Sequence, residues 1–244
     1  MKQSVFTIAE NVPLTENVYK MVLTGDVSAI TAPGQFINIK LDGLFLRRPI
    51  SVCDVSSDTV TIIYKVVGKG TEQMSAMQAG ETLDILSGLG NGYDTSLSGD
   101  APLLLGGGAG VPPLYMLAKK LIAEGKKVSV ILGFNTKDEV FYEDEFKALG
   151  AEVFVTTVDG SYGIKGFVTN AIPENYTHFY ICGPEPMLKA VYKATKTSGQ
   201  FSFEERMGCG FGACMGCSCK TITGFKRICK DGPVLMKEEI LWEN

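Results

Sequence analysis

The chain has 244 residues, a formal net charge of −4 at pH 7, and 45% hydrophobic residues. This acidic balance excludes a nucleic-acid or anionic-membrane surface, because phosphate binding needs a positive potential. The first residues do not resemble a signal peptide, and no apolar run approaches the roughly 20 residues of a membrane helix, so we expect a cytoplasmic protein. Thiols stay reduced there, and an odd total of seven cysteines fits a disulfide framework poorly.

Residues 1–98 are predicted to form short strands. Alternate residues of Phe36–Leu41 ("FINIKL") are aliphatic, and Thr59–Val67 ("TVTIIYKVV") is rich in β-branched residues between turn signals. Short strands separated by turns predict a small antiparallel β-barrel.

The pattern changes at Ser96–Pro102 ("SLSGDAP"), where strands begin to alternate with helical segments. One helical face carries leucines from Leu114 to Leu121, and a later one carries Leu188 and Val191. Strands alternating with helices predict a doubly wound parallel sheet over residues 99–199. Its expected strands are Leu103–Leu105, Val128–Leu132, Glu152–Val158 and His178–Cys182.

Residues 200–244 are rich in Gly and Cys and have too few large apolar side chains for a core of their own. Four cysteines follow the spacing Cys209-x4-Cys214-x2-Cys217, with Cys229 after eleven further residues. This is the plant-type 2Fe-2S spacing, and thiolate sulfur suits iron. The segment is therefore predicted to be a small 2Fe-2S domain. Glycines would let the backbone approach the cluster closely: Gly208, Gly210, Gly212 and Gly216.

Two other interpretations of the cysteines stay open. A zinc site is the main alternative, although such sites more often use two Cys-x2-Cys pairs. Structural or redox-active thiols are the other. Cys219 is expected to be a spare thiol, and Cys53 and Cys182 are expected in core or pocket positions.

A glycine-rich turn follows the first strand of the predicted sheet, in "LLLGGGAGVPPL". Such a turn lets the backbone approach a diphosphate at a helix N-terminus, although a tight turn without a ligand is the alternative. A second turn, Cys182–Gly183, ends another strand and is expected to line a nicotinamide pocket. The predicted NAD-binding residues are Gly106, Gly107, Gly108, Ala109, Gly110, Cys182 and Gly183.

The predicted barrel contains a candidate flavin site. Arg48 precedes Pro49, which biases it towards an extended backbone, and its planar fork can clamp a phosphate. Ser51 can hydrogen-bond a flavin ring, and Ile62–Thr71 supplies an aromatic ring, a cation and a Gly-Thr turn. Each feature alone also fits an ordinary surface or strand residue. The single histidine, His178, lies in a strand pattern and is expected to pack, so we predict no catalytic acid or base.

Together these three regions resemble the ferredoxin–NADP reductase superfamily. The motifs "RRPIS", "GGGAGVPP", "CGPEPM" and "ERMGCGFGACMGCSC…RICKDGPV" resemble more narrowly the electron-transfer subunits of type B dihydroorotate dehydrogenase, over essentially the whole chain. The resemblance implies FAD, NAD and one 2Fe-2S cluster held by Cys209, Cys214, Cys217 and Cys229. It implies FAD contacts from Arg48, Pro49, Ile50, Ser51, Ile63, Tyr64, Lys65, Gly70 and Thr71.

The resemblance also implies a partner and a pathway. In that family a separate FMN subunit oxidises dihydroorotate in pyrimidine biosynthesis, and electrons then pass through the cluster and FAD to NAD+. A heterotetramer with two copies of each chain is expected. Related chains serve ferredoxin-dependent NADP oxidoreductases, sulfide dehydrogenases and sulfite reductases, which remain alternatives. A zinc-stabilised nucleotide-binding or regulatory module is the non-enzymatic alternative.

Two finer expectations concern specificity and docking. No arginine follows the predicted strand Val128–Leu132, where Lys137 is the only cation, so NAD is expected over NADP. Phe211, Ala213 and Met215 lie between the predicted ligands. They are expected to contact a partner protein, with packing against the chain's own flavin domain as the alternative.

Overall fold

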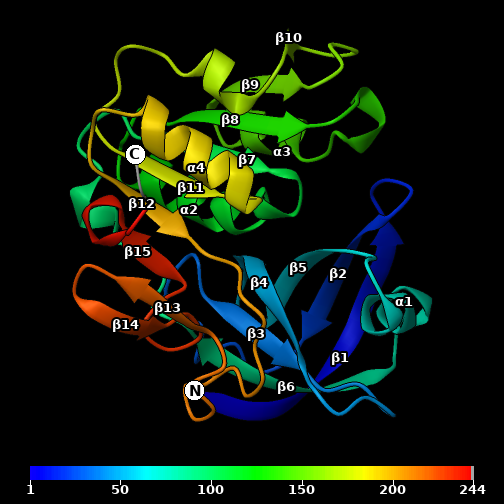
Figure 1. The fold of residues 1–244 in the computed structure, drawn as a ribbon. Coiled ribbons are helices and arrows are strands. Elements are labelled where there is room, and N and C mark those ends of the chain that lie inside the picture. The colour runs from blue at the N-terminus through cyan, green and yellow to red at the C-terminus, as the bar shows by residue number, and fades with distance from the viewer. Residues whose placement is uncertain (243–244) are drawn as a thin grey trace.

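The computed structural model describes residues 1–242, which form a barrel, an open sheet and a small hairpin (Figure 1). The barrel and the open sheet lie at opposite ends of the molecule, and the tail lies beside both. The predicted fold class, an antiparallel barrel followed by a parallel sheet with helices and a cysteine-rich tail, is confirmed. No helix of these residues is long and apolar enough to cross a membrane.

Six antiparallel strands close the barrel in the order β1-β2-β5-β4-β3-β6. Side chains alternate along each strand, so residues such as Phe6, Met21 and Ile62 fill the interior and are fully buried. The Asn11 amide donates to the last carbonyls around helix α1 and fixes that helix against the barrel. The elements are β1 (Lys2–Pro13), β2 (Val18–Thr24), β3 (Phe36–Ile39), β4 (Arg48–Val55), β5 (Thr59–Lys65), α1 (Lys69–Ala76) and β6 (Thr82–Leu89).

The open sheet has the order β10-β9-β8-β7-β11-β12-β15, and helices cover both of its faces. Its central strands are continuous apolar runs, as expected for parallel strands buried on both faces. The strands are β7 (Leu103–Gly107), β8 (Ser129–Phe134), β9 (Glu152–Thr157), β10 (Ile164–Lys165), β11 (Phe179–Cys182), β12 (Gly199–Ser202) and β15 (Val234–Met236). The helices are α2 (Pro113–Ala123), α3 (Glu143–Ala148) and α4 (Glu185–Ala194), with 3-10 turns at Thr95–Leu97, Gly108–Gly110, Lys137–Glu139, Val168–Ala171 and Lys237–Glu239.

The tail is joined to this sheet more closely than its sequence indicates. The boundary expected at residue 199 falls inside β12, which pairs in parallel with β11. Further along, β15 returns and pairs with β12 in antiparallel register. Pairing between backbones does not depend on a particular side-chain pattern. A three-residue segment such as Val234–Met236 therefore cannot be recognised from the sequence as a strand of a distant sheet.

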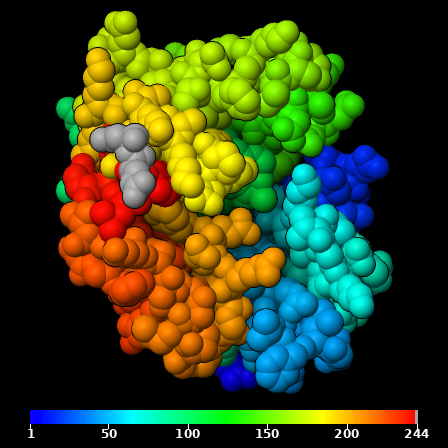
Figure 2. Space-filling model, in the orientation of Figure 1, coloured from blue at the N-terminus to red at the C-terminus, as the bar shows by residue number. Residues whose placement is uncertain are grey.

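Between β12 and β15 lie the cysteines and the hairpin of β13 (Ser218–Thr221) and β14 (Gly224–Arg227). This segment packs on the barrel: Phe36 and Leu89 share an apolar cluster with Ile228 and Leu235. The tail therefore borrows a core from its neighbours, as its composition predicts. Figure 2 shows the tail, in orange and red, against both the barrel and the open sheet.

The barrel and the sheet also touch directly. Cys53 and Ile63 of the barrel belong to the same apolar cluster as Leu114 of α2. At the rim of this contact, Lys119 on α2 pairs with Asp54 on β4 at 2.9 Å. The two predicted cofactor domains are thus fixed against each other by a shared core.

Candidate cofactor sites

The four predicted cluster cysteines form two pairs. Cys209 and Cys214 lie within hydrogen-bond reach of each other, and the N–H groups of Ala213 and Cys214 donate to Cys209 Sγ at 3.2 and 3.5 Å. Cys217 and Cys229 form the second pair, with the Cys229 N–H donating to Cys217 Sγ at 3.4 Å.

Two pairs suit a binuclear cluster better than a single ion. Across residues 1–242, no three Cys, His, Asp or Glu side chains converge on one ion position. A zinc ion held by four cysteines needs all four sulfurs around one point, whereas each iron of a 2Fe-2S cluster takes two thiolates. All seven cysteines are free of disulfides. The donor set fits the cluster, and the assignment of each ligand remains a prediction.

Glycines form a narrow cradle around the first pair. A Cβ on Gly208 would lie 3.1 Å from Cys214 Sγ, and the Gly216 N–H donates to the same sulfur at 3.5 Å. Burial raises the pKa of the Cys209 thiol, but N–H donors led by that of Phe211 outweigh it and lower the pKa to about 6. These donors stabilise the thiolate, which is the form that binds iron.

The two pairs differ in exposure. Cys217 and Cys229 are each 2% exposed and pack with Phe36 of the barrel, whereas Cys214 is exposed. One side of the predicted cluster site therefore faces the chain's own barrel and the other faces the surface. Cys219 lies on β13, opposite Lys226, and packs beside Cys217 and Cys229, so its role as a non-ligand stays a prediction.

Sequence reasoning did not identify the residue that anchors the loop from the hairpin side. Arg227 donates to the Gly212 carbonyl at 3.0 Å and pairs with Asp231 through Nε and Nη2, at 2.9 and 3.1 Å. The sequence feature that could have indicated this anchor is the spacing of Arg227 and Asp231, four residues apart.

The candidate flavin site is an opening between two strands of the barrel. Strand β4 pairs with β3 over Arg48–Ser51, but with β5 only over Val52–Val55. On the N-terminal side of Val52, β4 separates from β5. The backbone of Ile63–Lys65 therefore has no ladder partner on β4. The predicted flavin residues thus lie on the two edges of one opening.

At the end of this opening, the Arg48 side chain lies across the start of α1. A Cβ on Gly70 would lie 2.2 Å from Arg48 Nε, so only glycine allows this approach. The Thr71 hydroxyl accepts from the Val67 N–H at 2.9 Å and donates to the Gly68 carbonyl at 3.0 Å, which fixes the turn. A guanidinium beside the first turn of a helix is a suitable site for a diphosphate.

The predicted flavin residues differ in how far their side chains are buried. Pro49, Ile50, Ser51 and Lys65 are half-buried, whereas Ile63 is buried in the core shared with α2 and Tyr64 is buried in the barrel core. The Tyr64 hydroxyl donates to Asn11 Oδ1 at 2.9 Å, and its ring stacks on Tyr19. Any contact of Tyr64 with flavin would therefore use its backbone.

The two predicted nucleotide turns meet at the point where the order of the open sheet reverses. Strand β7 lies between β8 and β11, and Gly106 is in register with Cys182. A Cβ on Gly110 would lie 2.2 Å from the Cys182 oxygen, so the turns pack backbone to backbone. Ligands of doubly wound sheets bind at this reversal point. Burial raises the pKa of Cys182 to about 12, which keeps it a neutral thiol.

Glu139 lies in the 3-10 turn that follows β8, the second strand of the predicted sheet, where NADP binding would be expected to need a cation. It follows β8, and its carboxylate accepts from the N–H and Nδ2 of Asn135 at 3.1 and 2.8 Å. We therefore expect NADH to be used better than NADPH by at least about tenfold in kcat/KM, which corresponds to about 1.4 kcal/mol. Steady-state oxidation of both nucleotides with a dye acceptor measures this, and Glu139→Gln is expected to narrow the gap. Equal use of NADPH would contradict the prediction.

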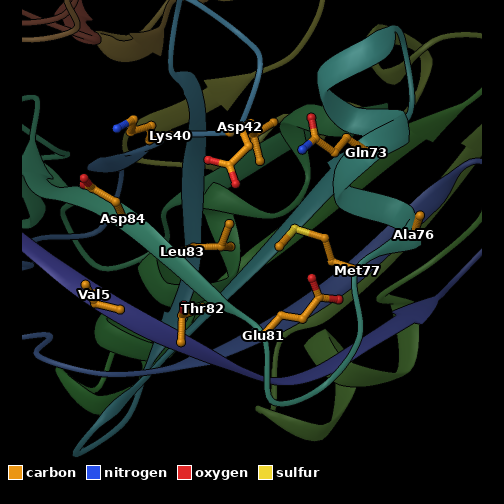
Figure 3. Close-up of a pocket in the computed structure, with 11 residues that line it drawn as sticks. Val5, Lys40, Asp42, Gln73, Ala76, Met77, Glu81, Thr82, Leu83 and Asp84 are labelled. Carbon is orange, nitrogen blue, oxygen red and sulfur yellow. The ribbon is translucent and has the colours of Figure 1, made fainter.

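A pocket of about 520 Å³ lies elsewhere on the barrel (Figure 3). It lies between α1, β6 and the loop after β3, and its labelled walls include Lys40, Asp42, Gln73 and Glu81. None of the predicted site residues lines it.

Comparisons with known proteins agree with this arrangement. Residues 204–241 match the family described as the iron-sulfur cluster binding domain of dihydroorotate dehydrogenase B, and residues 104–193 match the oxidoreductase NAD-binding domain. A chain from the structure of NADH-dependent reduced ferredoxin-NADP oxidoreductase is similar at a TM-score of 0.89 and 32% identity, covering 98% of this chain and 90% of that one. A ferredoxin NADP+ reductase from Neisseria gonorrhoeae shares the fold, at a TM-score of 0.70 and 18% identity, with 80% and 90% covered.

These matches define an oxidoreductase of the ferredoxin–NADP reductase fold that carries an iron–sulfur binding domain. Two curated relatives are electron transfer subunits of dihydroorotate dehydrogenase B (NAD(+)). The one from Fusobacterium nucleatum is 47% identical over 98% of this chain and 99% of its own, and the one from Bacillus pumilus is 46% identical over 98% of each. The chain belongs to the family of dihydroorotate dehydrogenase B electron transfer subunits, and the predicted resemblance is confirmed.

Proposed function

We propose that this chain carries electrons between a dihydroorotate-oxidising FMN subunit and NAD+, as one half of a heterotetramer with two copies of each chain. The observation that carries the proposal is the position of the cysteine pairs, one buried against the barrel and the other reaching the surface. A redox centre so placed can exchange electrons with the chain's own flavin and with a second protein. The identity to dihydroorotate dehydrogenase B subunits supports this partner over the other reductase complexes.

The chain's residues would supply binding and orientation rather than acid–base chemistry. When bound, FAD exchanges hydride with NAD and single electrons with a 2Fe-2S cluster. Arg48 and the first turn of α1 would hold the FAD diphosphate, and the turns at Gly106–Gly110 and Cys182–Gly183 would hold NAD. Cys209, Cys214, Cys217 and Cys229 would hold the cluster. His178 is only 3% exposed and its Nε2 lies 3.3 Å from Gln200 Nε2 inside the sheet, so its expected role is packing.

The surface beside the exposed cysteine pair suits a protein partner. Phe211 is 42% exposed and Met215 is 54% exposed, and neither belongs to an apolar cluster of the chain's own core. Met215 also has a positive φ of 60°, which is unfavourable for a residue with a side chain and is typical of functional loops. Ala213 is exposed between them. The alternative, packing on the flavin domain, does not describe these side chains.

The proposed division of labour has a direct test. The isolated holo-chain is expected to oxidise NADH with artificial acceptors but not to oxidise dihydroorotate, because that step is assigned to the FMN subunit. Adding the FMN subunit is expected to confer dihydroorotate-dependent NAD+ reduction. Oxidation of dihydroorotate by the isolated chain would refute the proposal.

Met215→Glu is expected to weaken association with the FMN subunit about fivefold or more, since loss of a residue at the centre of an interface costs upwards of about 1 kcal/mol. The dye reaction of the isolated chain is expected to stay unchanged. Ile164→Glu is the matched control, because Ile164 is an exposed apolar residue on β10, far from the tail in Figure 1. If both variants weaken the coupling equally, the surface around Met215 is not the docking surface.

A further inference from the structure

The outer face of β3 is covered by the cluster loop. Ile37 and Ile39 point into the barrel core, so Phe36 and Asn38 point outward. Phe36 packs against Cys217 and Cys229, and Asn38 is nevertheless only 1% exposed. A polar side chain on the outside of a barrel is usually solvated, so its burial here requires a specific partner.

That partner is the backbone of the first predicted ligand. Asn38 Nδ2 donates to the Cys209 carbonyl at 3.3 Å. The next residue, Gly210, has a φ of +80°, and a Cβ there would lie 2.3 Å from Asn38 Nδ2. The loop is therefore fitted to this amide in both its hydrogen bonding and its shape.

The same residue is joined to the candidate flavin site through its backbone. Asn38 pairs with Pro49 across the β3–β4 ladder, and its carbonyl accepts from Arg47 Nη1 at 3.3 Å. Pro49 lies in the Arg48–Ser51 stretch that forms one edge of the flavin opening. Asn38 thus contacts the loop of one predicted cofactor with its side chain and the strand of the other with its backbone.

The Asn38 amide is only half satisfied. Its Oδ1 is buried and has no hydrogen-bond partner among residues 1–242. A leucine of similar size would avoid an unpaired buried acceptor, so packing alone does not account for asparagine here. Only the Nδ2 donor of this side chain makes a hydrogen bond, and that bond is to the Cys209 carbonyl.

We propose that Asn38 is the positioning residue that fixes the Cys209 end of the cluster loop against the flavin strand β4. The inference rests on the proposed function and deepens it. Electron exchange between two bound groups slows steeply as their separation grows. The hydrogen bond from Asn38 holds the cluster loop against β3, and it therefore fixes the distance between the two cofactor sites. The predicted cluster ligands do not fix that distance by themselves.

Asn38→Leu and Asn38→Asp test the proposal, since both keep the side chain's approximate size and both remove the donor. We expect amide hydrogen exchange in residues 208–216 to accelerate at least about tenfold in both variants, as the loop opens locally. The measurement applies to the apo chain as well as the holo chain, because the hydrogen bond is made by the protein alone. In the holo chain we expect a broadened electron paramagnetic resonance signal from the reduced cluster, and slower cluster reduction by NADH with unchanged flavin reduction.

Asn91→Leu is the matched control. Asn91 also fastens the tail to the barrel, through the carbonyls of Asp231 and Val234 at 3.2 and 3.0 Å, but it does not touch the ligand loop. Unchanged exchange in residues 208–216 of the Asn38 variants would overturn the proposal, as would the same acceleration in Asn91→Leu. If the wild-type chain with the FMN subunit does not reduce NAD+ with dihydroorotate, the proposed function is refuted instead. The hydrogen-exchange measurements on residues 208–216 would still test the role of Asn38.

Discussion

Replacing Cys214 or Cys217 by serine is expected to remove the 2Fe-2S cluster, with loss of its visible absorbance and of most of the bound iron and sulfide. Each thiolate would occupy one of two protein positions at an iron, and a serine hydroxyl is a hard, weakly acidic substitute. Cys214→Ser is the cleaner variant, because Cys214 is exposed and its loss removes little packing. Cys217 is buried in the tail's apolar cluster, so its variant also tests the stability of the tail.

Cys219→Ser is the control for this experiment. Cys219 lies on β13 and is predicted to bind no iron, so iron and sulfide content are expected to stay at the wild-type level. Cys229→Ser is expected to behave like Cys217→Ser, its pair partner. The ligand assignment is wrong if Cys219→Ser loses iron while Cys229→Ser retains it.

Arg48→Ala is expected to weaken FAD binding about 10- to 100-fold, because a hydrogen bond to a charged group contributes about 1.5–3 kcal/mol. The guanidinium lies across Gly70 at the start of α1, where a diphosphate would lie. Gly70→Ala is expected to act in the same direction, since its Cβ would displace Arg48. Titration of the apo chain with FAD, followed by flavin fluorescence, measures both affinities.

The neighbouring arginine gives a stringent control. Arg47 donates to the Asp84 carboxylate and to the Asp84 carbonyl, both at 2.9 Å, whereas the side chain next to Gly70 is that of Arg48. Arg47→Ala is therefore expected to lower the thermal midpoint of the apo chain while leaving its affinity for FAD near the wild-type value. Loss of FAD from Arg47→Ala with retention by Arg48→Ala would reverse the assignment of the flavin arginine.

Local patterns predicted the elements that bury their own side chains. The strand at Thr59–Val67 appears as β5, the helix after the glycine turn as α2, and the helix after Cys182 as α4. Periodic burial is encoded within a few neighbouring residues, so it can be read from a single sequence. The cysteine spacing is similarly local, because one short loop supplies three of the four predicted ligands.

Contacts between distant segments were not predictable in this way. Nothing near Asn38 indicates that its amide meets Cys209, 171 positions later. The divergence of β4 from β5 depends on where two ladders end, and the burial of Tyr64 depends on Asn11 from another strand. Such features arise from tertiary pairing, which a sequence pattern within one element does not contain.

Because β15 pairs with β12, the cluster segment leaves the sheet after Ser202 and rejoins it at Val234, on the neighbouring strand. Cys229 lies five residues before that return, so the last predicted ligand and the closing strand are ordered together. Any ion or cluster that binds only the closed segment stabilises the closed sheet by mass action. Cofactor assembly and the final step of folding would then be thermodynamically linked, and a chain deprived of iron would show its first loss of order at the β12–β15 edge.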